Sequence, residues 1–228
     1  MTVVRRSHWR AARGAFTLLE LMVVVAIISF AALGFALALG DSGGSALATG
    51  QTMLSTMVGT ARAQAAVNQT EARLLIYATR PPGGDPEKYL RLMQVVRAEP
   101  AGSNTWVPAS AVVTLPRGIC VVPASVTGLL AAGVTWPSNP PLLSTLGAAF
   151  NPGQVTGTPF ATPATAFYLE FRADGTCPQV GSQSYARLLV GTTTLSNNQP
   201  QFTNNAAVRG LIIRPSGAIT FVNDAANF

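Results

Sequence analysis

The longest apolar run in the chain extends from Phe16 to Leu39 and reads FTLLELMVVVAIISFAALGFALAL. Its only strongly polar member is Glu20. A run of about 20 apolar residues is long enough to cross a bilayer as a helix. The pattern therefore predicts a membrane-spanning helix over residues 16–39.

Beyond this run, apolar and small residues recur at helical spacing, with polar residues between them. The sequence GDSGGS at 40–45 predicts a weakened or interrupted helix, because glycine is a poor helix former. Residues 40–70 are expected to form this hinge and an amphipathic helix that ends near Asn68. The side chains expected to face a core are Leu47, Leu54, Met57 or Val58, Ala61 and Ala65.

Beyond residue 70 the pattern favours strands. Residues 123–165, rich in Pro, Gly, Ser and Thr, are expected to be an extended insertion or a surface loop with little regular structure. The predicted fold class is α+β, with a long N-terminal helix packed on an antiparallel β-sheet domain over residues 71–228. Strands are expected at 72–79, 89–97, 111–115, 119–122, 166–172 and 185–190, followed by a closing hairpin at 210–222.

The residues before the apolar run are basic and include no acid. Basic residues beside a first apolar segment keep that end in the cytoplasm, which places the following domain on the other side of the membrane. A conventional secretory signal has a shorter apolar stretch that ends at a cleavage site. We therefore expect processing in front of the run, where Gly14-Ala15 meets Phe16. The basic residues are Arg5, Arg6, Arg10 and Arg13.

Glu20 lies inside the predicted span. A lone carboxylate in hydrocarbon costs roughly 2.5–3.5 kcal/mol on insertion scales and usually has a function and a partner. No basic residue in the run can pair with it, so its partner must come from elsewhere. An ordinary membrane anchor that tolerates a Glu near the interface is the simpler alternative.

The segment GAFTLLELMVVVAII at 14–28 resembles the class III signal of type IV pilins and type II secretion pseudopilins. The resemblance implies that prepilin peptidase removes a leader, residues 1–15, and that the new terminus becomes N-methyl-Phe16. Glu20 is then the fifth mature residue. The family usually has Gly directly before the cut, whereas Ala15 is there in this chain. A cut after Gly14 would make Glu20 the sixth residue, so cleavage before Phe16 is preferred.

The resemblance also supplies a partner for Glu20, the positive amino terminus of a neighbouring subunit. It implies prepilin peptidase, other pilins or pseudopilins, an inner-membrane assembly platform and membrane lipid as partners. The expected location is the bacterial inner membrane, with a single pass and a periplasmic C-terminal domain, and then the pseudopilus or pilus.

Three short motifs resemble those of H-type minor pseudopilins and related minor pilins. They are GTARAQAA at 59–66, FRADG at 171–175 and IRPSG at 213–217. The resemblance is strong over 13–39, weak over 45–80 and the C-terminal hairpin, and absent from the insert.

The formal net charge of +6 overstates that of the processed chain. Removing the four leader arginines from the 15 basic residues leaves 11 against nine acids, a net charge of +2. Nucleic acid is therefore an unlikely partner. A DNA-binding minor pilin, for uptake or adhesion, remains the alternative if late strands form a basic stripe. The stripe would comprise Arg172, Arg187, Arg209 and Arg214.

Cys120 and Cys177 are both in the part expected outside the cytoplasm. An oxidising compartment favours a disulfide between them, which would stabilise the fold by about 2–4 kcal/mol. The alternative is two free buried thiols that pack as small apolar residues.

Catalytic chemistry is not indicated. GDSGG at 40–44 matches the nucleophile motif of trypsin-like proteases, but a serine nucleophile needs a base, and the only histidine is His8 in the leader. The acids Asp85 and Glu87, and Glu170 and Asp174, are expected to be solvated charges. We expect no cofactor and no metal site. The sequence thus predicts a structural minor subunit of a pseudopilus or pilus that serves protein secretion, and not an enzyme.

Overall fold

The computed structural model describes residues 18–39, 42–138, 141–150, 155, 159–160, 164–178 and 185–228. The chain divides into two compact units, Met1–Ser42 and Gly43–Phe228. The first unit contains helix α1 (Leu18–Leu39), which coincides with the apolar run. Among the described residues, no helix meets the length and hydropathy needed to cross a membrane.

Helix α2 (Ser42–Asn68) begins within the glycine-rich segment that was expected to interrupt it. The predicted apolar stripe is confirmed, because all six of its residues are buried, with both Met57 and Val58 turned inward. The opposite face is polar and exposed. There the Thr52, Thr56 and Thr60 hydroxyls donate hydrogen bonds to carbonyls four residues earlier.

Two antiparallel sheets form the rest of the second unit. The first has the order β3-β2-β1-β7-β6, with β4 also paired to β2. The second has the order β11-β10-β8-β5, with β9 paired to β8. The first sheet comprises β1 (Ala72–Tyr77), β2 (Leu92–Ala98), β3 (Trp106–Pro108), β4 (Val113–Thr114), β6 (Gly147–Phe150) and β7 (Ala166–Phe171). The second comprises β5 (Ile119–Val121), β8 (Ala186–Ser196), β9 (Gln199–Phe202), β10 (Val208–Ile213) and β11 (Ile219–Val222), and a 3₁₀ turn (Ala225–Asn227) follows.

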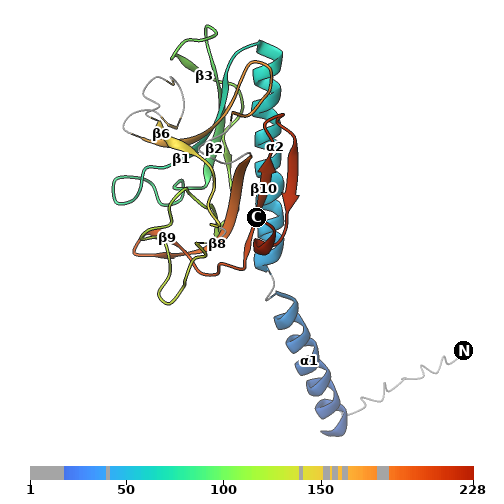
Figure 1. Ribbon diagram of the computed structural model, residues 1–228. Coiled ribbons are helices and arrows are strands. Elements are labelled where there is room, and N and C mark those ends of the chain that lie inside the picture. Colours follow the sequence, from blue (N-terminus) through green and yellow to red (C-terminus); the bar gives the residue numbers. More distant parts are fainter. Residues whose placement is uncertain are drawn as a thin grey trace, which may run out of the picture. The chain divides into compact units, whose positions relative to one another are not determined.

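The main core lies between α2 and the inner faces of both sheets (Figure 1). Alternate strand residues enter it, for example Leu74 and Ile76 of β1 and Leu188 and Val190 of β8. Because side chains alternate across a strand, the intervening residues point to the outer faces. Leu75 and Leu189 do so and are also fully buried, so both outer faces need cover.

The insert at 123–165 supplies much of that cover, which corrects the expectation of a surface loop. On the second sheet, Leu129 and Leu142 join the cluster of Leu189. On the first sheet, Val155 and Phe160 join the cluster of Leu75. The insert also contributes β6, which pairs with β7. A low-charge segment with scattered apolar residues thus becomes a packing layer, because the strands beneath it are apolar on both faces.

The three short motifs noted in the sequence meet at one place near the end of α2. The Arg62 side chain lies over two glycines that both have positive φ, Gly175 and Gly217. A β-carbon on Gly175 would lie 3.4 Å from Arg62 Cγ, and one on Gly217 would lie 2.7 Å from Arg62 Nε. The motifs therefore describe a single junction between the helix and two turns.

Candidate functional site

The residues expected to be processed, Gly14, Ala15 and Phe16, lie outside the described residues. Glu20 belongs to α1, but its side chain is not described. The structure therefore places the backbone of Glu20, and its role in assembly and its pairing stay predictions.

The described side chains of α1 lie within residues 18–29, are exposed on every side of the helix and are all apolar except Ser29. The exposed fractions of the large apolar ones run from 44% for Val24 to 78% for Leu18. An exposed apolar surface of this extent marks a region that another molecule or a lipid phase covers. Because these apolar side chains surround the helix, a partner that contacts one side alone would leave the others exposed. The exposed residues are Leu18, Leu19, Leu21, Met22, Val23, Val24, Val25, Ile27 and Ile28.

The structure does not form the basic stripe required by the DNA-binding alternative. Arg187 pairs with Ile212 across the sheet, and Arg209 pairs with Val190. Residues 187 and 190 are an odd number of positions apart on β8, so Arg187 and Arg209 lie on opposite faces. Arg187 is also buried.

The structure contains two free thiols in place of the expected disulfide. Cys120 belongs to the outer cluster of the second sheet, whereas Cys177 belongs to the core beside α2. Burial raises the pKa of each thiol to about 11. The Thr193 hydroxyl donates a hydrogen bond of 3.3 Å to Cys120 Sγ. The alternative reading, in which both cysteines pack as small apolar residues, describes this arrangement.

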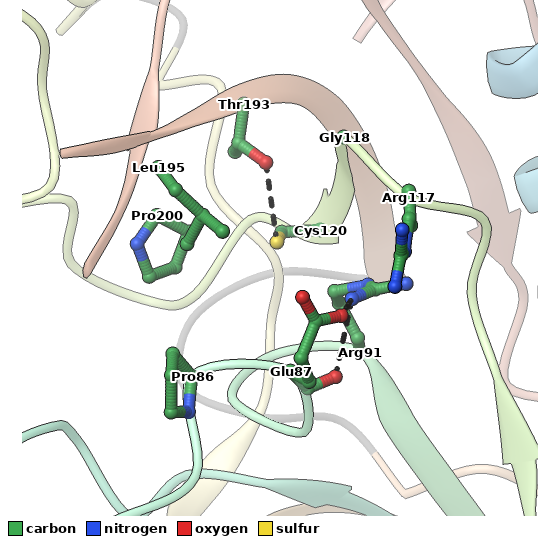
Figure 2. A pocket seen from close by; sticks show the side chains of 9 residues that line it. All are labelled: Pro86, Glu87, Arg91, Arg117, Gly118, Cys120, Thr193, Leu195 and Pro200. Atoms are coloured by element: carbon green, nitrogen blue, oxygen red, sulfur yellow. Dashed lines mark hydrogen bonds and ion pairs between the residues drawn. The ribbon is translucent and has the colours of Figure 1, made fainter. Parts of the chain in front are cut away.

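A pocket of about 280 Å³ opens beside Cys120 (Figure 2). It is formed where three segments meet: the turn before β2, the turn before β5 and the end of the β8–β9 hairpin. Its lining combines charged, sulfur-containing and apolar side chains. The lining residues are Pro86, Glu87, Arg91, Arg117, Gly118, Cys120, Thr193, Leu195 and Pro200.

Arg91 forms one wall of the pocket and is nine-tenths buried. Its guanidinium donates to the Leu115 carbonyl at 2.8 Å and forms an ion pair with Glu87, whose side chain is half exposed. The Arg91 Nε–H is buried and has no hydrogen-bond partner among the described residues. Arg91 is thus held firmly in position but incompletely satisfied.

Arg117 lies at the tip of the neighbouring turn and is exposed. The Ile119 amide donates to the Pro116 carbonyl at 3.1 Å, and Gly118 has a φ of 75°, which together define a tight turn. In Figure 2 the Arg117 guanidinium points toward that of Arg91. No ion pair joins Arg117 to an acid in the described part of the chain.

Three of the four acids in the close pairs of the sequence have a cationic partner, and the fourth, Asp174, accepts hydrogen bonds from Thr176. Asp85 pairs with Lys88, and Glu170 pairs with Arg73. The Glu87 amide donates a hydrogen bond to Asp85 and lowers the pKa of that carboxyl group. Within the described ranges, no three His, Cys, Asp or Glu side chains gather as a metal site would require.

Sequence reasoning did not find the pocket. Glu87 and Arg91 are four residues apart, a spacing that indicates no chemistry by itself, and Arg117 joins them only through the fold. A Pro-Arg-Gly turn at 116–118 that exposes an arginine was the one available signal.

Comparison with known proteins identifies the N-terminal segment. Residues 10–36 match the family described as "Prokaryotic N-terminal methylation motif". No curated protein and no solved structure matches the chain. The matched range includes Gly14, Phe16 and Glu20, together with much of α1. The chain therefore carries a type IV pilin-like prepilin signal at its N-terminus.

Proposed function

We propose that this protein is a structural minor subunit of a periplasmic pseudopilus or type IV pilus and serves protein secretion. The observation that carries the proposal is α1, a helix of exposed apolar side chains that coincides with most of the methylation motif. Such a helix needs an apolar environment on all sides. The inner membrane before assembly, and the helices of neighbouring subunits afterwards, would each provide one.

Assembly would depend on Glu20 and the new amino terminus. The Glu20 carboxylate is penalised when alone in lipid and stabilised beside a positive charge. The amino group of Phe16 in a neighbouring subunit would supply that charge. Prepilin peptidase, other pilins or pseudopilins and the inner-membrane platform are the partners that follow from this role.

The three motifs that meet at Arg62 favour the H-type minor pseudopilins as the subtype. We assign the domain a structural role and no catalytic one, since the chain has no histidine outside the leader. A DNA-binding role is not favoured, because Arg187 and Arg209 lie on opposite faces of the sheet.

The mature amino terminus tests the proposal. The full chain is expressed with an active prepilin peptidase and, separately, with an inactive one, and its N-terminal peptide is identified by mass spectrometry. We expect N-methyl-Phe16 only with the active enzyme. The variant Ala15→Gly, which restores the usual residue before the cut, should give the same product at an equal or higher yield.

The same measurement can refute the proposal. An uncleaved leader with the active peptidase, or cleavage beyond Leu39, would make the chain an anchored or secreted domain that does not assemble through Phe16. A terminus at Ala15 would keep the filament role and move Glu20 to the sixth position.

A further inference from the structure

The pocket beside Cys120 has an uncompensated positive charge. Its three charged lining residues are Glu87, Arg91 and Arg117. The single carboxylate, Glu87, is engaged by Arg91. The Arg117 charge is therefore left without an acidic partner in the described part of the chain, in a pocket that Arg91 also lines (Figure 2).

Arg91 forms a wall of the same pocket, and its guanidinium is fixed in position and largely removed from water. Its buried Nε–H has no partner among the residues that the structure describes, and an unsatisfied buried donor is unfavourable. The Glu87 carboxylate compensates the charge of Arg91 but not that of Arg117. A second anion beside Arg117 would compensate the remaining guanidinium charge electrostatically.

The remaining lining selects against a simple inorganic ion. Pro86, Leu195 and Pro200 form an apolar border, and Leu195 is 58% exposed although it is a large apolar residue. The volume of about 280 Å³ is slightly below the range of pockets for drug-sized ligands. It suits a single carboxylate with one short apolar group. A guanidinium binds a carboxylate through two parallel hydrogen bonds, which an exposed arginine on a tight turn is free to make.

We propose that this pocket binds a carboxylate attached to a short apolar group, with Arg117 as its main donor. The carboxylate would belong to a small organic acid or to a polypeptide, at its C-terminus or at an acidic side chain next to an apolar residue. This recognition site goes beyond the assembly role. It uses none of the residues of the methylation motif.

The test is a titration of the full chain in detergent micelles, followed by ¹H–¹⁵N NMR at the Gly118 amide and the arginine Nε–H groups. The probe is N-acetyl-leucine, and its neutral amide, N-acetyl-leucinamide, is the matched control. We expect saturable shifts with the acid alone, and weaker binding at higher salt because the interaction is ionic.

Two variants identify the donor. Arg117→Gln should weaken binding about tenfold or more, since a charge-assisted pair is lost. Arg214→Gln removes an exposed arginine outside the pocket and should leave affinity unchanged. Equal binding of the acid and the amide, equal affinity of Arg117→Gln and the unaltered chain, or the absence of saturable shifts would each overturn the proposal.

Two peptides distinguish the sources of the carboxylate. One ends in a free C-terminal leucine, and the other is amidated and carries an internal Glu-Leu pair. Arg117-dependent binding that is stronger for one peptide would support the proposal and identify which carboxylate is recognised. Binding of N-acetyl-leucine alone would support a small acid. Cleavage before Phe16 should be unchanged in Arg117→Gln, so failure here is distinguishable from failure of the filament role.

Discussion

Gly217 approaches Gly175 so closely that a β-carbon on Gly217 would lie 2.5 Å from the Gly175 carbonyl oxygen. Both residues have a φ of 76°, a conformation that L side chains rarely adopt. The Arg62 side chain lies over the same pair. The end of α2, the turn after β7 and the β10–β11 turn therefore fit together this closely because Gly217 lacks a side chain, whereas a β-carbon on Gly175 would make only ordinary contacts.

Replacing Gly217 should destabilise the domain by more than one mechanism. For Gly217→Ala we expect a loss of more than about 2 kcal/mol in the free energy of unfolding, from backbone strain and the contact with a rigid carbonyl. Gly102→Ala is the matched control, since Gly102 has a φ of 74° but open space around it. Urea denaturation should show a loss of only about 1 kcal/mol for the control. Equal losses would mean that the close contact has no effect.

Gln51 joins α2 to the edge of the second sheet. Its buried side-chain amide donates to the Gly210 carbonyl at 2.8 Å and to the Val222 carbonyl at 3.0 Å. Gln51→Leu should cost about 1–3 kcal/mol in unfolding free energy, because it leaves both buried carbonyls without this donor. Thr52→Ala, on the exposed face, should change stability by less than about 0.5 kcal/mol. A Gln51→Leu variant as stable as the Thr52→Ala control would contradict this prediction.

The buried thiols predict a loss of stability in alkaline solution. The pKa of each is raised from 9.0 to about 11 by burial, so the unfolded chain releases these protons at a lower pH than the folded one. Their contribution is therefore complete below pH 9 and is lost progressively as pH rises toward 11. Urea unfolding between pH 8 and pH 11 should show a steeper decline for the unaltered chain than for Cys120→Ala/Cys177→Ala. Parallel curves would contradict the prediction.

The same burial predicts slow alkylation. At pH 8 iodoacetamide should label the two cysteines of the folded chain much more slowly than those of the urea-unfolded chain, because the thiolate is the reactive form. Mass spectrometry measures the labelling. Two rapidly labelled cysteines would contradict the burial, and an unlabelled pair in the unfolded, unreduced chain would indicate the disulfide that the sequence suggested.

Glu20 should control assembly and not processing. For Glu20→Ala we expect normal removal of the leader but a large loss of incorporation into filaments, because the terminal amine of the neighbour has no partner. Ser29→Ala is the control in the same helix, where the Ser29 hydroxyl donates a hydrogen bond to the Val25 carbonyl. Filament fractions can be compared by immunoblotting. Assembly of Glu20→Ala at the level of the control would argue against the pairing.

Local patterns were sufficient for the elements whose signal lies within one segment. The six apolar residues of α2 recur at helical spacing, and all are buried. Strands β1, β2, β7 and β10 were expected from their apolar and β-branched content. Strands β3, β6 and β9 were missed, because each is short and contains proline or small residues. Their existence depends on a neighbouring strand that offers hydrogen bonds.

The sequence by itself determined the N-terminal signal, since Phe16, Glu20 and the apolar run are adjacent in the chain and the methylation motif is a linear segment. Only the tertiary structure decided the role of the insert, the separation of Cys120 from Cys177 and the meeting of Glu87, Arg91 and Arg117. These features depend on contacts between segments far apart in the chain. Sheet order and register, which no local pattern encodes, establish such contacts.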